Sequence, residues 1–369
     1  MVKQTLLIVS SVLLTGLTTT IPLVAQARQP LLLSQQQPTN EQLNELLRQG
    51  RALVDAGDYA RAIATYQQAA NLDRQNPRIF SGIGYLQARQ GNFREAARSY
   101  QQAIALDPNN AEFQYALGYS LANAEDNAGA AAAYRRAIQL DSNNVNYYFG
   151  LGAVLLRQKD YDGAIQTYRN VLNFQPRNAQ VYELIGSVYL EEGRPQDALK
   201  VLQQAATLAP RQSSVQIRLG LAWLSQGNKK AALDAFEEAA RLDPNSSQVY
   251  LQIGKVLQAQ KDLPSALEAF QKAISLQPDS IEAQTAIGEI LLSQENYIEA
   301  IVAYRRLIEL SPQDPQAHYN LGVALKGRDR IPEAIAAIEK ARDLYRRIGD
   351  SEGTGKAESL LRELKKSER

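Results

Sequence analysis

Apolar residues recur along most of the chain at the three- and four-residue spacing of one helix face. Within residues 77–110, Phe80, Ile83 and Leu86 keep this spacing, and a second stretch of helical spacing begins after Gly91. The period of the apolar positions indicates the type of secondary structure, because one face of each element meets the core. This segment therefore predicts two helices joined by a short turn.

The two-helix segment repeats in register every 34 residues. Each copy carries a glycine in its first helix, an alanine twelve residues later, and a bulky residue four residues after that alanine. The glycines are Gly50, Gly84, Gly118, Gly152, Gly186, Gly220, Gly254, Gly288 and Gly322. The bulky residues are Tyr66, Tyr100, Tyr134, Tyr168, Leu202, Phe236, Phe270, Tyr304 and Ile338. Most copies close on a proline, which cannot extend the hydrogen-bond ladder of the second helix.

The recurring residue types have a direct physical use in a helix pair. Gly84 has no side chain and Ala96 has a single methyl group, so the two helices that carry them can approach closely. Tyr100 is then expected to fill the space beside this close approach, and Asp107-Pro108 is expected to end the second helix.

This pattern of Gly, Ala, bulky residue and terminal Pro resembles the tetratricopeptide repeat, which has the same period. The resemblance implies an all-α fold, a right-handed superhelical solenoid of helix-turn-helix repeats. Residues 349–369 are predicted to hold a break at 349–355 and then a capping helix at Lys356–Arg369, because a solenoid leaves the apolar face of its last repeat uncovered. The nine expected repeats are residues 43–76, 77–110, 111–144, 145–178, 179–212, 213–246, 247–280, 281–314 and 315–348.

The N-terminal residues have the pattern of a secretory signal. Lys3 precedes a mainly apolar stretch at residues 5–24, and Ala25-Gln26-Ala27 offers the small side chains that a signal peptidase accepts. We predict a signal peptide at residues 1–27, a flexible polar linker at 28–42, and an exported protein that is periplasmic or otherwise extracytoplasmic. The alternative is an uncleaved membrane anchor at residues 5–24, since about 20 apolar residues suffice to cross a bilayer.

Composition removes several classes of function. The chain has no Cys and one His, which argues against thiolate catalysis, disulfides and Cys/His metal sites. Its 40 Lys and Arg residues nearly balance its 39 Asp and Glu residues, whereas nucleic-acid binding requires a clustered basic surface. We therefore expect no catalytic residues, no cofactor, no metal and no nucleic-acid partner.

Two local patterns that suggest chemistry are better explained by structure. Gly353-Thr354-Gly355-Lys356 lacks the full spacing of a phosphate-binding loop, and Ala357 follows where that loop needs Ser or Thr. His318 stands where the repeat places a packing aromatic residue and has no second His or Cys for a metal site. We expect both patterns to be structural.

Proteins with these repeats hold an extended peptide or a helix in a groove lined by successive first helices. The resemblance implies that five positions of each repeat line this groove: the second, fifth, ninth, twelfth and thirteenth residues. In repeats one to four the basic residues at these positions outnumber the acidic ones: Arg51, Arg78, Arg89 and Arg157, with Asp55 and Glu112 as the acids. In repeats five to nine the acidic residues outnumber the basic ones: Glu183, Glu191, Glu282 and Glu289, with Lys255 and Lys326 as the bases.

Aromatic residues and Arg are enriched at interface hot spots. The predicted partner-binding residues are therefore Arg78, Tyr85, Arg89, Tyr115, Tyr119, Phe149 and Arg157. The alternative for the tyrosines is that they pack against neighbouring helices.

The sequence thus favours a non-catalytic protein-interaction scaffold that binds one or more proteins or peptides and assists assembly of an extracytoplasmic or envelope complex. One alternative is a membrane-anchored adaptor, in which the membrane is contacted through the uncleaved N-terminal segment. Another is an accessory subunit of an enzyme complex, since no residues outside the repeats remain for a catalytic domain.

Overall fold

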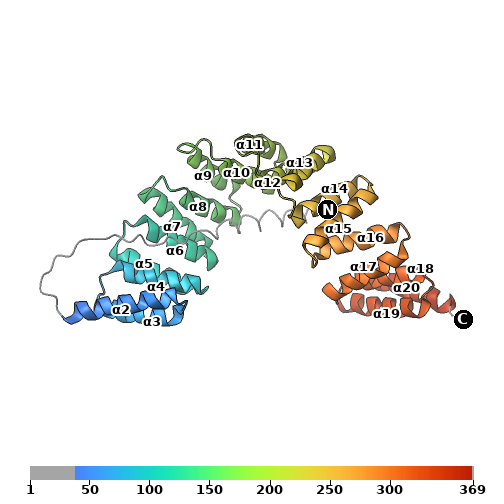
Figure 1. Ribbon diagram of the computed structural model, residues 1–369, viewed down its shortest axis with the longest axis horizontal. Coiled ribbons are helices and arrows are strands. Elements are labelled where there is room, and N and C mark those ends of the chain that lie inside the picture. Colours follow the sequence, from blue (N-terminus) through green and yellow to red (C-terminus); the bar gives the residue numbers. More distant parts are fainter. Residues whose placement is uncertain (1–37, 368–369) are drawn as a thin grey trace. The chain divides into compact units, whose positions relative to one another are not determined.

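The structure is a computed structural model that describes residues 38–367 (Figure 1). Every regular element in this range is a helix, so the predicted all-α class is confirmed. In the first part of the chain the helices are α2 (Pro38–Asp55), α3 (Tyr59–Leu72), α4 (Pro77–Arg89), α5 (Phe93–Leu106), α6 (Ala111–Asn123), α7 (Asn127–Leu140), α8 (Val145–Arg157), α9 (Tyr161–Leu172), α10 (Ala179–Glu191) and α11 (Pro195–Leu208). They continue with α12 (Ser213–Ser225), α13 (Lys229–Leu242), α14 (Ser247–Ala259), α15 (Leu263–Leu276), α16 (Ile281–Ser293), α17 (Tyr297–Leu310), α18 (Pro315–Gly327), α19 (Ile331–Arg347) and α20 (Ser351–Ser367).

The signal peptide predicted at residues 1–27 lies outside the described residues, as does most of the predicted linker at 28–42. The end of that linker is wrong, because α2 already begins at Pro38. Pro is favourable at the first helical position, where the backbone N–H has no partner in any case, and Glu41 in the first turn interacts well with the helix dipole. None of the described helices is long and apolar enough to span a bilayer.

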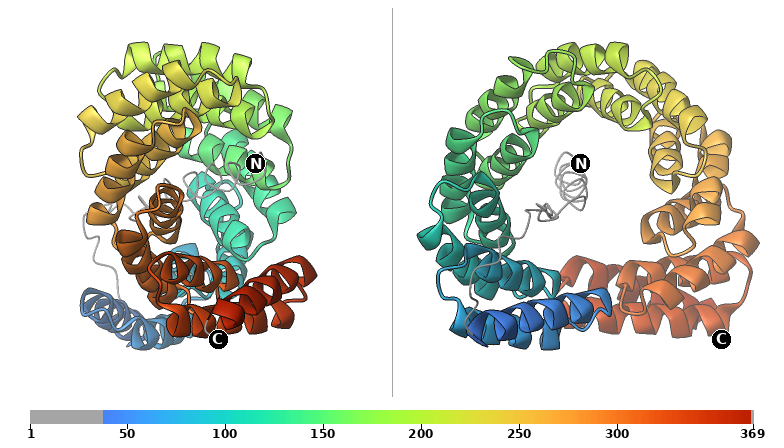
Figure 2. Two further views of the ribbon diagram at one scale, coloured as in Figure 1. Left: turned by 90° about the vertical axis from the view of Figure 1, so that its right-hand side faces the viewer. Right: turned by 60° about the vertical axis from the view of Figure 1, so that its left-hand side comes forward.

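The helices pack as consecutive antiparallel pairs in two compact units. The N-terminal unit extends to Leu208, and the C-terminal unit begins at Ala209. In both units an even-numbered first helix packs on the odd-numbered second helix that follows it, as the views in Figure 2 show within each unit. This is the solenoid arrangement that the sequence predicts.

Each repeat glycine lies directly against the bulky residue of its own second helix. A Cβ atom added to Gly254 would stand 2.6 Å from the ring of Phe270, one added to Gly118 would stand 2.9 Å from Tyr134, and one on Gly186 would stand 2.5 Å from Leu202. The same contact occurs in every described helix pair from α2 and α3 to α18 and α19. The 34-residue spacing of these glycines therefore corresponds to a close contact within each helix pair.

The turn within each pair has a second recurring feature that the sequence analysis missed. The fifteenth residue of every repeat has a positive φ, including Lys159 at 60° and Lys261 at 67°. The residues are Gly57, Gly91, Gly193, Gly227, Glu125, Lys159, Lys261, Glu295 and Asp329. Glycine adopts this conformation without steric cost, and other residues do so less readily. The turn geometry is thus kept even where glycine is absent.

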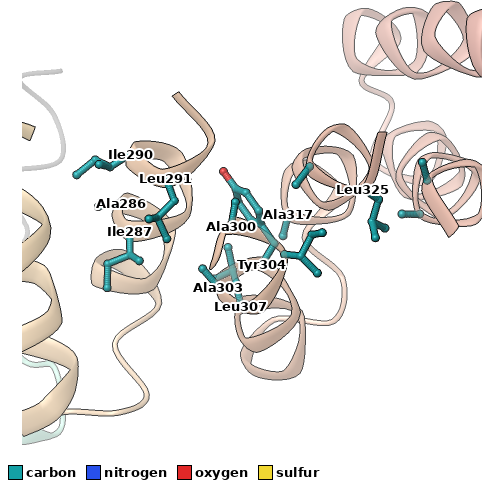
Figure 3. Close-up of a cluster of buried hydrophobic side chains, with 14 of the residues drawn as sticks. Ala286, Ile287, Ile290, Leu291, Ala300, Ala303, Tyr304, Leu307, Ala317 and Leu325 are labelled. Carbon is teal, nitrogen blue, oxygen red and sulfur yellow. The ribbon is translucent and has the colours of Figure 1, made fainter. Parts of the chain in front are cut away.

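Within each unit, buried side chains fill the space between successive pairs. Figure 3 shows this for the C-terminal unit, where Ile287 and Ile290 of α16, Tyr304 and Leu307 of α17 and Leu325 of α18 are all buried. The rows of alanine that accompany them, such as Ala300 and Ala317, are nearly inaccessible to solvent. Small residues at these positions let the next pair pack closely.

Helix α20 covers the last pair, as predicted for a capping helix, and buries Ala357, Leu360, Leu361 and Leu364. The break predicted at residues 349–355 is too long, because α20 begins at Ser351. The Asp350 carboxylate accepts a hydrogen bond of 2.9 Å from the Gly353 backbone N–H and so starts the helix early. Gly353 is tolerated there because its missing side chain makes room for the Tyr345 ring.

We predict that Gly254→Ala lowers the free energy of unfolding by about 1–3 kcal/mol, since the added methyl group overlaps the buried Phe270 ring. Gly82→Ala is the matched control. Its methyl group would meet the Tyr66 ring at 3.8 Å, an ordinary contact, and alanine favours the helix by up to about 1 kcal/mol. Urea unfolding should move the two midpoints in opposite directions. Equal shifts would contradict the role assigned to the glycine contact.

Candidate partner-binding surface

The seven residues predicted to bind a partner all lie on first helices of the N-terminal unit. Helix α4 carries Arg78, Tyr85 and Arg89; α6 carries Tyr115 and Tyr119; α8 carries Phe149 and Arg157. Helix α6 approaches both α4 and α8 with Cα atoms within 8 Å. Within this unit the first helices therefore follow one another along one side of the stack, called the inner side. Six of the seven residues keep some exposure and are called the aromatic–arginine surface: Arg78, Tyr85, Arg89, Tyr119, Phe149 and Arg157.

Tyr115 contributes to the core rather than to this surface. Its side chain is 8% exposed, and its ring lies 5.3 Å from the Tyr147 ring and 5.7 Å from the Tyr134 ring, measured between centroids. Burial raises the pKa of the Tyr115 hydroxyl. Tyr115 thus joins α6 to α7 and α8 and offers little area to a partner.

Tyr85, Tyr119 and Phe149 are half-buried and keep part of each ring open. The Tyr119 ring meets Phe93 edge-on at 6.2 Å, and the Phe149 ring meets Tyr168 in the same way at 6.3 Å. Edge-to-face contacts between aromatic rings are favourable and orient both partners. The Tyr119 and Phe149 rings are therefore held in place by second-helix residues behind them.

Arg89 is fixed by an aromatic residue that the sequence analysis did not single out. Its Nη2 donates a hydrogen bond of 3.1 Å to the Tyr59 hydroxyl, and its guanidinium carbon lies 5.7 Å from the centre of the Tyr59 ring. This hydrogen bond raises the pKa of Arg89 above its usual value. An aromatic residue begins the second helix at 59, 93, 161 and 297, and this recurrence was the available signal.

Arg157 is held by a neighbouring helix end. Its Nη1 donates a hydrogen bond of 2.7 Å to the carbonyl oxygen of Ala122, in the last turn of α6. The C-terminal carbonyl groups of a helix carry partial negative charge, so a guanidinium is stabilised there. Arg78 is exposed near the start of α4.

The corresponding face of the C-terminal unit has a different character. The Lys255 Nζ lies 2.5 Å from a Glu282 carboxylate oxygen, and the Lys326 Nζ lies 2.6 Å from Glu363 on α20. Burial raises the pKa of the Glu289 carboxyl group on α16. The Tyr319 side chain on α18 is half-buried. Both lysines of this face thus have carboxylate partners within the chain.

The described residues contain no group of three or more His, Asp and Glu side chains placed to hold a metal ion. His318 has a structural contact, since its Nε2 lies 3.2 Å from the Pro312 carbonyl oxygen. The hydroxyls of Tyr148 and Tyr182, at the same repeat position, donate to the carbonyls of Ser142 and Pro176. The position therefore ties a first helix to the preceding loop.

Family models of repeat proteins match most of the chain. One described as the Cilia and flagella-associated protein 70 C-terminal domain matches residues 11–240. Models described as tetratricopeptide repeat match residues 224–290 and 315–340, and one described as TPR repeat matches residues 288–327. A comparison with curated proteins finds no match.

Several solved structures are similar to this chain. A tetratricopeptide repeat protein from Parabacteroides merdae is 17% identical, with a TM-score of 0.53, and the match covers 68% of this chain and 99% of that one. MamA is 28% identical, with a TM-score of 0.42, over 44% of this chain and 95% of that one. YrrB, a TPR protein with an unusual peptide-binding site, is 25% identical, with a TM-score of 0.40, over 52% and 98%. The first of these likenesses concerns the fold alone.

We predict that Tyr115→Ala destabilises the protein by about 3 kcal/mol, because it empties a buried aromatic site. Tyr119→Ala removes a half-buried ring and should cost clearly less. Thermal unfolding followed by circular dichroism compares the two. If Tyr119→Ala were the more destabilising change, Tyr119 would be a core residue and not part of the open surface.

Proposed function

The chain belongs to the tetratricopeptide repeat family, and we propose that it is a non-catalytic scaffold that holds a peptide or protein segment along the aromatic–arginine surface. In this proposal nine repeats at residues 43–348 form the scaffold. One observation carries it: half-buried rings and fixed guanidinium groups gather on first helices that contact one another.

The chemistry of these residues supports binding. Tyr and Phe contribute large contact area with few rotatable bonds, and Arg contributes several hydrogen-bond donors. Tyr and Arg are enriched at interface hot spots. The contacts of Tyr119 with Phe93, and of Arg89 with Tyr59, fix the side chains before a partner arrives. Side chains that are already ordered lose less entropy on binding.

A role as accessory subunit of an enzyme complex is the second candidate. In that case the scaffold presents a substrate or holds a catalytic subunit, and the purified chain has no activity of its own. The absence of a candidate metal cluster among the described residues is compatible with either role.

We further propose that the protein is exported and acts in the assembly of an extracytoplasmic or envelope complex. The support is the pattern of Lys3, the apolar stretch and Ala25-Gln26-Ala27. Mass spectrometry of the protein from its native cells tests this. We expect Arg28 at the N-terminus; an intact N-terminus in the membrane fraction would instead establish anchoring by residues 5–24.

Site-specific photo-crosslinking tests the scaffold proposal. A photoreactive phenylalanine analogue at Tyr119 is expected to capture a discrete partner in living cells, because this ring lies on the proposed surface. The same analogue at Ala132, which is exposed on the second helix α7, is the control. Capture of the same partner from Ala132 and not from Tyr119 would contradict the proposal.

A further inference from the structure

The arginines on the inner face of the N-terminal unit lack carboxylate partners. Arg51, Arg78, Arg89 and Arg157 are all exposed, and none forms an ion pair with a carboxylate of the described residues. The inner face of the C-terminal unit differs, since Lys255 pairs with Glu282 and Lys326 with Glu363. The two lysines are thus paired within the chain, whereas the four arginines of repeats one to four have no carboxylate partner among the described residues.

The acids available nearby do not neutralise these arginines. Asp55 and Glu112 are the acids at the predicted contact positions of repeats one to four, and neither is ion-paired within the described part of the chain. Elsewhere in the same unit Arg pairs readily, as Arg194 does with Asp197 at 2.8 Å. The inner arginines therefore keep their capacity for charge-assisted hydrogen bonds.

Two of these guanidinium groups are fixed and still have donors to spare. Arg89 uses Nη2 on the Tyr59 hydroxyl, and Arg157 uses Nη1 on the Ala122 carbonyl. A guanidinium has five N–H donors, and its fork geometry matches a carboxylate. The remaining donors of both groups are thus available to a carboxylate without further ordering of the side chain.

We propose that the segment held on the aromatic–arginine surface is acidic. Its Asp and Glu side chains meet Arg78, Arg89 and Arg157, and its apolar side chains meet the half-buried rings of Tyr119 and Phe149. This inference rests on the proposed function, because it names the chemistry of the segment that the scaffold binds.

Recognition uses side-chain carboxylates within the segment rather than a chain terminus. The Lys and Asn pair that clamps a terminal carboxylate in some proteins of this family is missing, since no repeat has Lys and Asn together at its fifth and ninth positions. A protein segment also fits better than a nucleic acid, because Asp55 and Glu112 on the same face would repel a continuous phosphate backbone.

Selection from a random peptide library tests the inference. The probe is a library of 12-residue peptides displayed without a free C-terminus and selected on residues 28–369. We expect enrichment of Asp and Glu together with aromatic or aliphatic residues. A selected peptide, made as its C-terminal amide, should bind more weakly at high salt and lose at least about tenfold in affinity when its Glu residues become Gln.

Matched variants locate the site. Arg78→Gln/Arg89→Gln should lose at least about tenfold in affinity for that peptide. Arg94→Gln/Arg98→Gln removes the same charge from exposed positions of the second helix α5 and should leave the affinity unchanged. Equal loss in both variants would mean that net charge and not this surface drives binding, which overturns the inference.

The outcomes separate this inference from the proposed function. Enrichment of neutral or basic peptides whose binding is lost in Tyr119→Ala would overturn the acidic segment and leave the scaffold proposal standing. If the enriched peptides bind Tyr119→Ala and Arg78→Gln/Arg89→Gln with the affinity of the parent protein, the acidic segment and the scaffold proposal are both overturned. The same follows if no peptide is enriched over a blank surface.

Discussion

The structure depends on one contact that recurs in every described pair: a glycine on the first helix against a bulky side chain on the second. The partners range from Tyr134 and Phe270 to Leu202, yet each fills the space that the missing Cβ leaves. Because interiors are packed nearly as densely as crystals, a single added methyl group is enough to push the helices apart. This contact sets the separation of the two helices and thereby the position of the next pair.

The fixed packing leaves the inner positions of the first helices free to differ between repeats. In the N-terminal unit these positions hold half-buried rings and arginines, of which Arg89 is oriented by Tyr59 and Arg157 by the end of α6. In the C-terminal unit they hold lysines already paired with Glu282 and Glu363. The same backbone thus presents one face with unused cationic donors and one face whose cations are compensated, and that difference is the physical basis of the proposed partner specificity.

Periodic features of the sequence predicted the fold well, and features set by a single neighbour were harder to predict. The Gly spacing gave the helix pairs, and the row Ala357, Leu360, Leu361 and Leu364 gave the capping helix. The sequence around Gly353 did not indicate that α20 already begins at Ser351. Glycine is tolerated in this helix because the Tyr345 ring packs against it, and the sequence does not show that contact. Tyr115 and Tyr119 lie one turn apart on α6, but only Tyr115 is enclosed, between Tyr134 and Tyr147. The sequence placed both on one face without distinguishing core from surface.

Amide hydrogen exchange of residues 28–369, alone and with the selected acidic peptide, tests the location of the partner most directly. Binding raises the free energy of local opening where the partner sits, so exchange slows there. We predict slower exchange in α4, α6 and α8, with α5, α7 and α9 changed less and α14 to α18 unchanged. Slowing confined to the second helices, or to the C-terminal unit, would contradict this prediction.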